Sequence, residues 1–323
     1  MVGEFKLIVE MGATKTDWRL CGVEGSVVAS VSGRGFNLAV SSRSDIEEAV
    51  REPYLLEASL RSSHIVEVWF YGAGCVSSCI SSPGRQSSCS DSSNGLGSSI
   101  DRPKVDDESG MEALSTTLLE LYPEAVIHYE SDMMAAARAI CGHEKGIVAI
   151  LGTGSNSCLY DGKKIVKNIR PGGFILGDEG SAAALGKLFL ADYIKGMIPE
   201  GIAMEFVRTF NLDKESSFDS QYMAIVNNVY KSDAPSRYLG GIAPFLISHI
   251  EDEYVRGLVR MNFRTFFERS LLRYWVDWPV GVVGSFGCAC ESILREVGEE
   301  MGLNFGRFMA SPADGLVAYH GRK

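Results

Sequence analysis

Three turns of the chain combine glycine with hydroxyl side chains, and each follows an apolar run. They span residues 12–14 (Gly-Ala-Thr), 152–155 (Gly-Thr-Gly-Ser) and 284–287 (Gly-Ser-Phe-Gly). Glycine lets the backbone approach a ligand closely and aim successive N–H groups at an anion, while threonine and serine add hydroxyl donors. Any one of them could be an ordinary turn. Three at matching places favour a site for nucleotide phosphates that needs no lysine.

Four polar side chains lie beside these turns or before predicted helices. Glu10 ends the first apolar run, where its carboxylate could hold a magnesium ion or be an ordinary strand-end acid. Asp132 opens "DMMAAARA", as a general base for a sugar hydroxyl or as a plain N-cap. Asp178 in "GDEGS" and Asn37 in "GRGFNLAV" suit contacts with a ligand, although a capping turn and a loop asparagine are the alternatives.

The elements that must position these residues occur twice along the chain. "FKLIVE", "DWRLCGV" and "SVVASVSG" predict a three-stranded meander, and "HIVEVWFYGAG" and "AVIHYES" predict two further strands. "GIVAILGTGSNSCLYDGKKIVKNI" then repeats the order strand, Gly-hydroxyl turn, strand, tight turn, strand. We interpret this repeat as an internal duplication of one supersecondary unit. Residues from about 202 to 277 are predicted to be mostly helical, and "PVGVVGSFG" is the last buried strand.

Two compositional features stand apart from this pattern. Residues 77–99 contain 11 serines in 23 positions, so we expect a flexible insertion that has no packing role. The chain has eight cysteines but no CxxC pair, and its five histidines do not cluster near them. We therefore expect reduced thiols rather than a zinc or redox site.

Chain length, net charge and hydropathy limit the class of protein. A chain of 323 residues suits two domains, and the net charge of -10 disfavours nucleic acid as a partner. No stretch approaches the roughly 20 apolar residues of a membrane helix, and the N-terminus does not resemble a signal peptide. We expect a cytoplasmic protein without a membrane partner.

The motifs "GATKTDW", "YGAGC", "SDMMAAARA", "ILGTGSNSCLYDG", "GFILGDEGS", "VVGSFG" and "SPADGLVAYH" occur in this order. Together they resemble the BadF/BadG/BcrA/BcrD-type ATPase family and, within it, bacterial N-acetylglucosamine kinase-like proteins. The resemblance skips the serine-rich insertion and is diffuse across the helical region. It implies an α/β fold of two duplicated ribonuclease H-like (actin/hexokinase-type) domains, each with a mixed five-stranded sheet, and an interdomain cleft.

The implied domains are residues 1–142, with the serine-rich insertion at about 77–109, and residues 143–323, whose last helix is free to pack back on the first domain. By resemblance the first two turns are phosphate hairpins, the third is the adenosine turn, and Asp132 is the catalytic aspartate. The expected nucleotide-binding residues are Gly12, Ala13, Thr14, Thr16, Gly152, Thr153, Gly154, Ser155, Gly284, Ser285 and Gly287. The expected sugar-binding residues are Asn37, Gly74, Gly173 and Asp178.

One motif departs from the family. The family has aspartate followed by glycine or serine where this chain has Glu10-Met11. Glutamate carries the same charge one methylene further out, and we expect Met11 to add bulk beside the same turn. A displacement of about 1 Å in a positioned group can cost on the order of 10²-fold in rate. The departure therefore predicts a weak enzyme.

The function predicted from the sequence is ATP-dependent phosphorylation of an amino sugar, N-acetylglucosamine at its 6-hydroxyl. ATP and Mg²⁺ are the expected cofactors, and Glu10 is the expected metal carboxylate. A small sugar is the expected substrate. The oligomeric state is not predicted, and a homodimer is one possibility. One alternative is an activator ATPase of a 2-hydroxyacyl-CoA dehydratase, which needs cysteines for an iron–sulfur cluster. The other is a weakly active, sugar-sensing kinase homologue.

Overall fold

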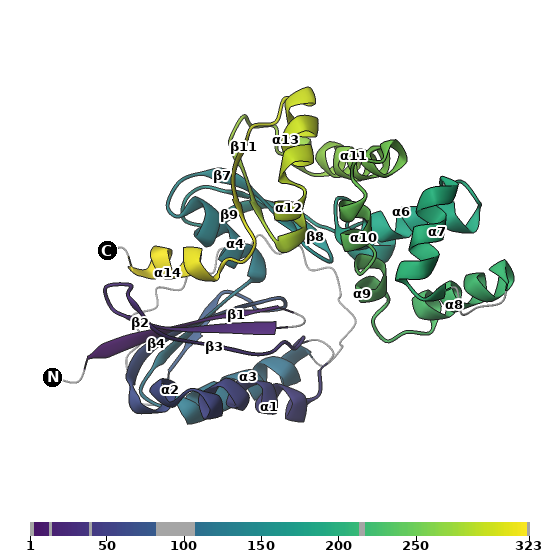
Figure 1. The fold of residues 1–323 in the computed structure, drawn as a ribbon. Helices are drawn as coiled ribbons and strands as arrows, with labels where there is room; N and C mark the ends of the chain where they lie inside the picture. Colours follow the sequence, from purple (N-terminus) through teal and green to yellow (C-terminus); the bar gives the residue numbers. More distant parts are fainter. Residues whose placement is uncertain (1–2, 13–14, 39–40, 82–106, 213–216, 322–323) are drawn as a thin grey trace. The chain divides into compact units, whose positions relative to one another are not determined.

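The computed structural model describes residues 3–12, 15–38, 41–81, 107–212 and 217–321. The chain forms two compact units, each built around one β-sheet with helices packed on it (Figure 1). Unit 1 comprises residues 1–142 and 312–323, and unit 2 comprises residues 143–311. Among the described residues, no helix is both long and apolar enough to cross a membrane.

Unit 1 contains a six-stranded mixed sheet with the strand order β3-β2-β1-β4-β6-β5. β1, β2 and β3 form the predicted antiparallel meander, while β1, β4 and β6 run parallel. The strands are β1 (Glu4–Met11), β2 (Lys15–Gly22), β3 (Val27–Arg34), β4 (His64–Gly72), β5 (Ser78–Ile80) and β6 (Val126–Glu130). The carboxyl ends of three neighbouring strands therefore meet at one edge of the sheet.

The alternation of side chains along β1 places its core residues and Glu10 on opposite faces of the sheet. Leu7, Val9 and Met11 point into the hydrophobic core of unit 1, and Glu10 points to the opposite face. The core side of the sheet is covered by α1, whose buried Ile46 belongs to the same cluster.

Helices cover both faces of the unit 1 sheet (Figure 1). α1 packs along α3 on one face, and α4 packs along α14 on the other. A Cβ on Gly315 of α14 would lie 2.6 Å from the carbonyl oxygen of Ala139 in α4, so this close helix contact requires glycine. The helices are α1 (Arg43–Leu56), α2 (Ala58–Ser62), α3 (Asp107–Leu121), α4 (Asp132–Cys141) and α14 (Ala313–Gly321).

The beginning of the serine-rich segment differs from the prediction. β5 adds a sixth strand to the expected five by pairing antiparallel with β6, and the Ser77 hydroxyl donates to Glu130. The expectation that residues 77–99 have no packing role is therefore wrong at their start, because the edge of β6 offers unpaired backbone groups. Cys79 is disulfide-bonded, which also corrects the expectation of reduced thiols at this position. The expected insertion continues into residues 82–106, which lie outside the described residues.

Unit 2 repeats the same plan with a five-stranded mixed sheet in the order β11-β10-β7-β8-β9. β7, β8 and β9 form an antiparallel meander, and β10 runs parallel to both β7 and β11. The strands are β7 (Gly146–Leu151), β8 (Ser155–Tyr160), β9 (Ile165–Ile169), β10 (Val280–Val283) and β11 (Phe305–Met309). The predicted duplication and α/β class are thereby confirmed.

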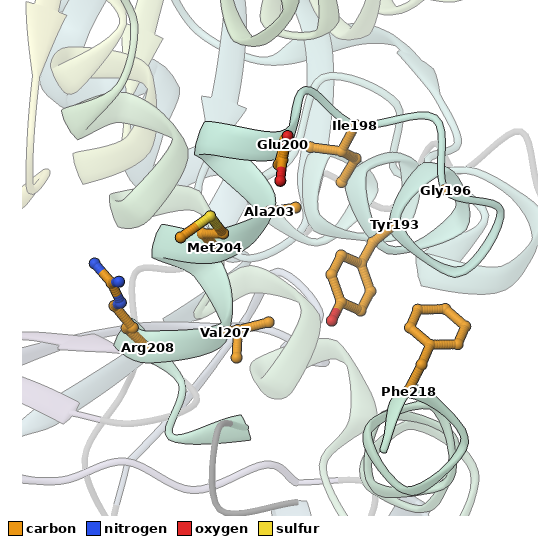
Figure 2. Close-up of a pocket in the computed structure, with 9 residues that line it drawn as sticks. All are labelled: Tyr193, Gly196, Ile198, Glu200, Ala203, Met204, Val207, Arg208 and Phe218. Carbon is orange, nitrogen blue, oxygen red and sulfur yellow. The ribbon is translucent and has the colours of Figure 1, made fainter. Parts of the chain in front are cut away.

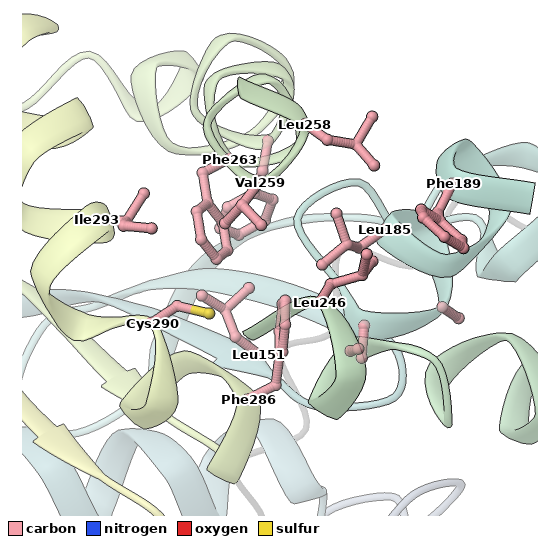
Figure 3. Packing of buried hydrophobic residues seen from close by; sticks show 14 of the residues in the cluster. Leu151, Leu185, Phe189, Leu246, Leu258, Val259, Phe263, Phe286, Cys290 and Ile293 are labelled. Carbon is pink, nitrogen blue, oxygen red and sulfur yellow. The ribbon is translucent and has the colours of Figure 1, made fainter. Parts of the chain in front are cut away.

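The helices of unit 2 pack around a large aromatic core. Leu151, Phe263 and Phe286 come from different elements and meet in this core, together with Leu185 and Cys290 (Figure 3). The helical prediction for residues 202–277 is correct. The helices are α5 (Gly173–Leu176), α6 (Ala182–Ile194), α7 (Glu200–Thr209), α8 (Phe218–Tyr230), α9 (Pro235–Gly240), α10 (Ala243–Ser248), α11 (Glu253–Arg269), a 3-10 helix (Leu271–Tyr274), α12 (Ser285–Ala289) and α13 (Glu291–Glu300).

Candidate functional site

Several of the residues singled out in the sequence lie at the carboxyl ends of parallel strands in each unit. In unit 1 Glu10 and Asp132 lie at or just beyond the ends of β1 and β6. Gly152 and Gly284 follow the ends of the parallel pair β7 and β10 in unit 2. This edge is where open α/β sheets bind their ligands.

Glu10 is the most perturbed carboxyl of this edge. Burial, followed by repulsion from Asp17 and Asp132, raises its pKa to about 7, and the Lys15 ammonium only partly opposes the shift. Asp17 stands opposite Glu10 in the register between β1 and β2, and it is 5% exposed. Asp17 and Asp132 thus lie near enough to Glu10 to raise the cost of charging it.

The described residues of unit 1 offer a carboxylate for a magnesium ion but no complete protein site for one. No group of three or more His, Cys, Asp or Glu residues in the described chain is arranged to hold a metal. Magnesium is usually bound by one or two protein carboxylates, by waters and by phosphate oxygens, and not by a complete protein cage. Glu10 could serve as such a carboxylate: burial and then repulsion from Asp17 and Asp132 raise its pKa, and a bound cation would offset that repulsion.

Asp132 is not the N-cap of α4. Ser131 occupies that position, and its hydroxyl accepts the N–H of Met134 at 3.1 Å. The Asp132 carboxylate accepts the adjacent N–H of Met133 at 2.8 Å. Burial raises the pKa of Asp132. A half-buried carboxylate that the helix does not need for its cap is free to take a proton.

Two residues of the first turn point away from the place expected for them. The Thr16 hydroxyl is buried, where it accepts from the Trp18 indole at 3.0 Å and lies 3.4 Å from the Arg34 carbonyl oxygen. These contacts do not support a phosphate contact by that hydroxyl. Met11 is 2% exposed and packs against Gly72 in the core. Against the expectation that Met11 adds bulk beside the turn, its side chain lies in the core instead, on the face of the sheet opposite Glu10.

The remaining residues predicted for unit 1 lie on loops. Asn37 is exposed, its N–H donates to the Ser41 hydroxyl at 3.1 Å, and Leu38 beside it contacts the loop of Gly74. Gly74 has a φ of +87°, a conformation that favours glycine. Gly12 closes its turn through an N–H bond to the Lys15 carbonyl at 2.9 Å. The predicted Ala13 and Thr14 lie outside the described residues.

In unit 2 the second turn is joined to the segment that carries Asp178. The carbonyl oxygens of Gly152 and Thr153 accept the N–H groups of Ala182 and Ala183 at 3.0 and 3.1 Å. The Ser155 hydroxyl donates to the Glu179 carbonyl at 2.7 Å. The turn is therefore fixed by backbone contacts at the start of α6, and the Ser155 hydroxyl is already in use.

Asp178 links the turn to α5. Its backbone has a φ of +56°, which is uncommon for a residue with a side chain. A Cβ on Gly154 would lie 3.0 Å from its Oδ2, so the carboxylate touches the turn directly. Burial raises the pKa of Asp178, while the N–H groups of Gly173 and Ser155 stabilise its charged form. Asp178 thus contacts both the second turn and the first residue of α5.

The third turn is mostly a packing feature. Gly284 has a φ of +127°, and a Cβ there would lie 2.2 Å from the Leu151 carbonyl oxygen. Ser285 begins the short helix α12, and Gly287 lies inside it, where a Cβ would meet Val282 at 2.6 Å. Glycine is required at both positions by the neighbouring strands. The expectation of an open turn over residues 284–287 is wrong beyond Gly284, because α12 begins at the next residue.

Asn262 of α11 is a positioning residue that the sequence analysis missed. It is 2% exposed, its Oδ1 accepts the Gly180 N–H at 3.0 Å, and its Nδ2 donates to the Ser181 carbonyl at 3.1 Å. The segment after Asp178 is therefore held from a helix about 80 residues further along the chain. A single asparagine in the apolar stretch "RMNFRTFF" is the only signal in the sequence, and it does not reveal its partners.

A second missed feature is a polar network behind Asp132. Arg138 donates to Glu130 and to the Tyr71 hydroxyl, both at 2.8 Å, and that hydroxyl lies 2.7 Å from His320 Nε2. Burial lowers the pKa of His320 to about 3, so the imidazole is neutral and accepts the Tyr71 proton. The network joins α14 to the strand end that precedes Asp132. Its sequence signal is an arginine inside the alanine-rich start of α4.

Solved structures of other proteins share this architecture. A protein from Porphyromonas gingivalis, provisionally assigned as an N-acetylglucosamine kinase, is 34% identical, and the match covers 98% of each chain with a TM-score of 0.79. A Chromobacterium violaceum protein with the same provisional assignment is 17% identical over 99% of this chain and 100% of that one, with a TM-score of 0.67. A ROK family glucokinase from Streptomyces griseus, in complex with glucose and AMPPNP, is 14% identical over 98% of each chain, with a TM-score of 0.54.

The last two matches show the fold alone, and no protein-family model or curated protein matches the chain. The fold and the strand-end residues define an actin/hexokinase-like α/β protein built from a duplicated unit, the architecture of sugar kinases. Within that class, the chain belongs to the family of the Porphyromonas gingivalis protein.

Proposed function

We propose that this protein is an ATP-dependent kinase that phosphorylates an amino sugar, N-acetylglucosamine, at its 6-hydroxyl. Membership in the family of a protein provisionally assigned to that activity supports the substrate class. The single observation that carries the proposal is Asp132, whose carboxylate is half-buried, raised in pKa and released from capping by Ser131. A general base for a sugar hydroxyl needs these properties.

In the proposed reaction the unit 1 residues handle protons and charge. Asp132 accepts the proton of the 6-hydroxyl as that oxygen attacks the terminal phosphorus of ATP. The bond from that phosphorus to the bridging oxygen of ADP breaks, and the products are the sugar 6-phosphate, ADP and a proton on Asp132. Glu10 would hold Mg²⁺, and that ion would neutralise charge on the phosphate oxygens. Asn37 and Gly74 contribute to the sugar site.

Unit 2 supplies the proposed nucleotide contacts mainly through its backbone. The turn of residues 152–155 presents peptide N–H groups to phosphate, since the Ser155 hydroxyl is engaged with Glu179. Gly284 brings the end of β10 against the same turn, close to Leu151. Asp178 and Gly173 are the proposed sugar contacts of this unit. Asp178 also contacts Gly154 of the proposed phosphate turn, so a change at either residue should affect both sugar binding and nucleotide binding.

The second candidate function is a sugar kinase homologue that binds sugar but has a low turnover rate, and one observation favours it. The pKa of Glu10 is raised to about 7, so near neutral pH much of the metal-free protein carries a protonated Glu10. Binding of magnesium must then displace that proton, which weakens metal binding at low pH.

The test is a phosphorylation screen with ATP and Mg²⁺ over N-acetylglucosamine, N-acetylmannosamine, glucosamine, glucose and muramic acid derivatives. We expect the highest kcat/KM for N-acetylglucosamine, with the 6-phosphate identified by NMR and with no product from Asp132→Asn. Sugar binding by calorimetry without turnover would select the slow homologue. Neither binding nor turnover with any of the sugars would overturn the proposal.

A further inference from the structure

α7 has two faces of opposite character. Ile202 and Phe206 are buried and join the core of unit 2. Glu200, Met204 and Arg208 follow one another at intervals of four residues, so they form one stripe on the opposite side of the helix. All three are exposed, and Met204 is 49% exposed.

This stripe borders an apolar groove of about 380 Å³ (Figure 2). Figure 2 shows Ala203, Val207 and Met204 along α7, with Tyr193 and Phe218 on the other side of the groove. Exposed apolar side chains continue on both sides of it: Met197 is 62% exposed, Phe218 48% and Tyr222, one turn further along α8, 38%. We call this surface the α7 patch, defined by Met197, Glu200, Met204, Arg208, Phe218 and Tyr222. Apolar surface of this kind, rimmed by charge, marks an interaction site.

The charges of the α7 patch identify its occupant. Glu200 and Arg208 form no ion pair among the described residues, whereas Glu205 on the same helix pairs with His249 at 2.6 Å. Eight residues of helix separate Glu200 from Arg208 by about 12 Å, so they cannot neutralise each other. A second α7 that runs antiparallel across Met204 would place its Arg208 at Glu200 and its Glu200 at Arg208. The patch is complementary to itself under a two-fold rotation.

We propose that the α7 patch docks a second copy of this chain, with α7 antiparallel to α7 and the two-fold axis beside Met204. The contact is isologous, so each ionic contact occurs twice. A stable interface needs about 800 Å² from each partner, more than one helix of ten residues provides, so Phe218 and Tyr222 of α8 belong to it. An acidic or a basic peptide would match only one end of the stripe. This inference does not depend on the proposed kinase activity.

The experiment measures the molar mass of the full chain by light scattering over a dilution series. Glu200→Arg and Arg208→Glu each place like charges together, so each variant should weaken the dimer by about tenfold. The double variant carrying both changes restores the opposite charges and should return the dissociation constant to that of the parent. Met204→Glu places a carboxylate on the axis and should weaken the dimer by about a hundredfold.

Met261→Glu is the matched control, because Met261 of α11 is 47% exposed and lies outside the patch. It should leave the dimer unchanged, and circular dichroism should show that every variant is folded. A monomeric parent at all concentrations would overturn the proposal, and so would equal effects of Met204→Glu and Met261→Glu. Two weakened single variants without recovery in the double variant would reject the antiparallel pairing.

Discussion

The two units place different chemistry on the same structural frame. In unit 1 the strand ends carry carboxyl side chains, and Asp17 and Asp132 lie close enough to Glu10 to raise its pKa further than burial alone. In unit 2 the corresponding edge carries glycine backbone, and the Asp178 carboxylate contacts the turn itself. A duplicated fold therefore fixes where a site lies, and the side chains at the strand ends decide what it can do.

The hydroxyl residues that open the second strand of each unit make this comparison sharper. Thr16 pairs with Met11 across the first hairpin, and Ser155 pairs with Leu151 across the second. Both hydroxyls are bonded within the chain, Thr16 by Trp18 and Ser155 to Glu179. In both units the hydroxyl is therefore already engaged in a hydrogen bond within its own unit.

The largest expected effect tests the chemistry of unit 1. Asp132→Asn should lower kcat by about 10²- to 10⁴-fold and leave sugar affinity within a few fold, since a general base acts on the reaction and not on binding. Ser131→Ala is the control, because it removes the cap of α4 and should cost about 1 kcal/mol of stability. Steady-state kinetics, calorimetry and thermal melting separate the two. Turnover of Asp132→Asn close to that of the parent would remove the base from this position.

The next effect tests the backbone chemistry of unit 2. A Cβ on Gly154 would lie 3.0 Å from Asp178 Oδ2, whereas a Cβ on Gly152 has nothing nearer than 4.0 Å. Gly154→Ala should weaken both nucleotide and sugar binding, on the order of tenfold, because it displaces Asp178. Gly152→Ala should weaken nucleotide binding alone. Calorimetry with each ligand is the measurement, and unchanged nucleotide affinity in both variants would move the phosphate site elsewhere.

A pH effect on stability is expected from unit 1. Because the folded state raises the pKa of Glu10 to about 7, its protonated form favours folding below the ordinary glutamate range. That stability is lost as pH rises through about 7, and the raised pKa of Asp132 acts in the same direction. Without metal, the melting temperature of the parent should fall more steeply from about pH 5 to 8 than that of Glu10→Gln. Parallel curves would show that Glu10 titrates normally.

The smallest effect concerns the edge of the unit 1 sheet. Ser77→Ala removes the hydroxyl that donates to Glu130, one partner of the buried Arg138 pair, and should cost about 1 kcal/mol in a denaturant melt. Ser78→Ala is the matched control, because its hydroxyl is exposed and bonds only the nearby Val76 carbonyl. A larger loss for Ser78→Ala than for Ser77→Ala would contradict the proposed role of Ser77.

The sequence by itself determined the elements and their order. Apolar runs that end in Gly-hydroxyl turns predicted both meanders and the duplication, with Glu10, Gly152 and Gly284 at or after the ends of strands. These features follow from local patterns, because strand and turn preferences act over a few residues. The family resemblance added the roles proposed for them.

Only the tertiary structure decided which way the side chains point and what they contact. Met11 faces the core, and the Thr16 hydroxyl accepts a hydrogen bond from the Trp18 indole, because the register of the sheet sets the face of every residue. Asn262 holds the segment after Asp178 across about 80 residues, and β5 pairs with an edge about 50 residues away. Such contacts join residues that lie far apart in the sequence, and the residues next to each one do not indicate its partner. Burial, pKa and hydrogen bonding are therefore set only when the chain has folded.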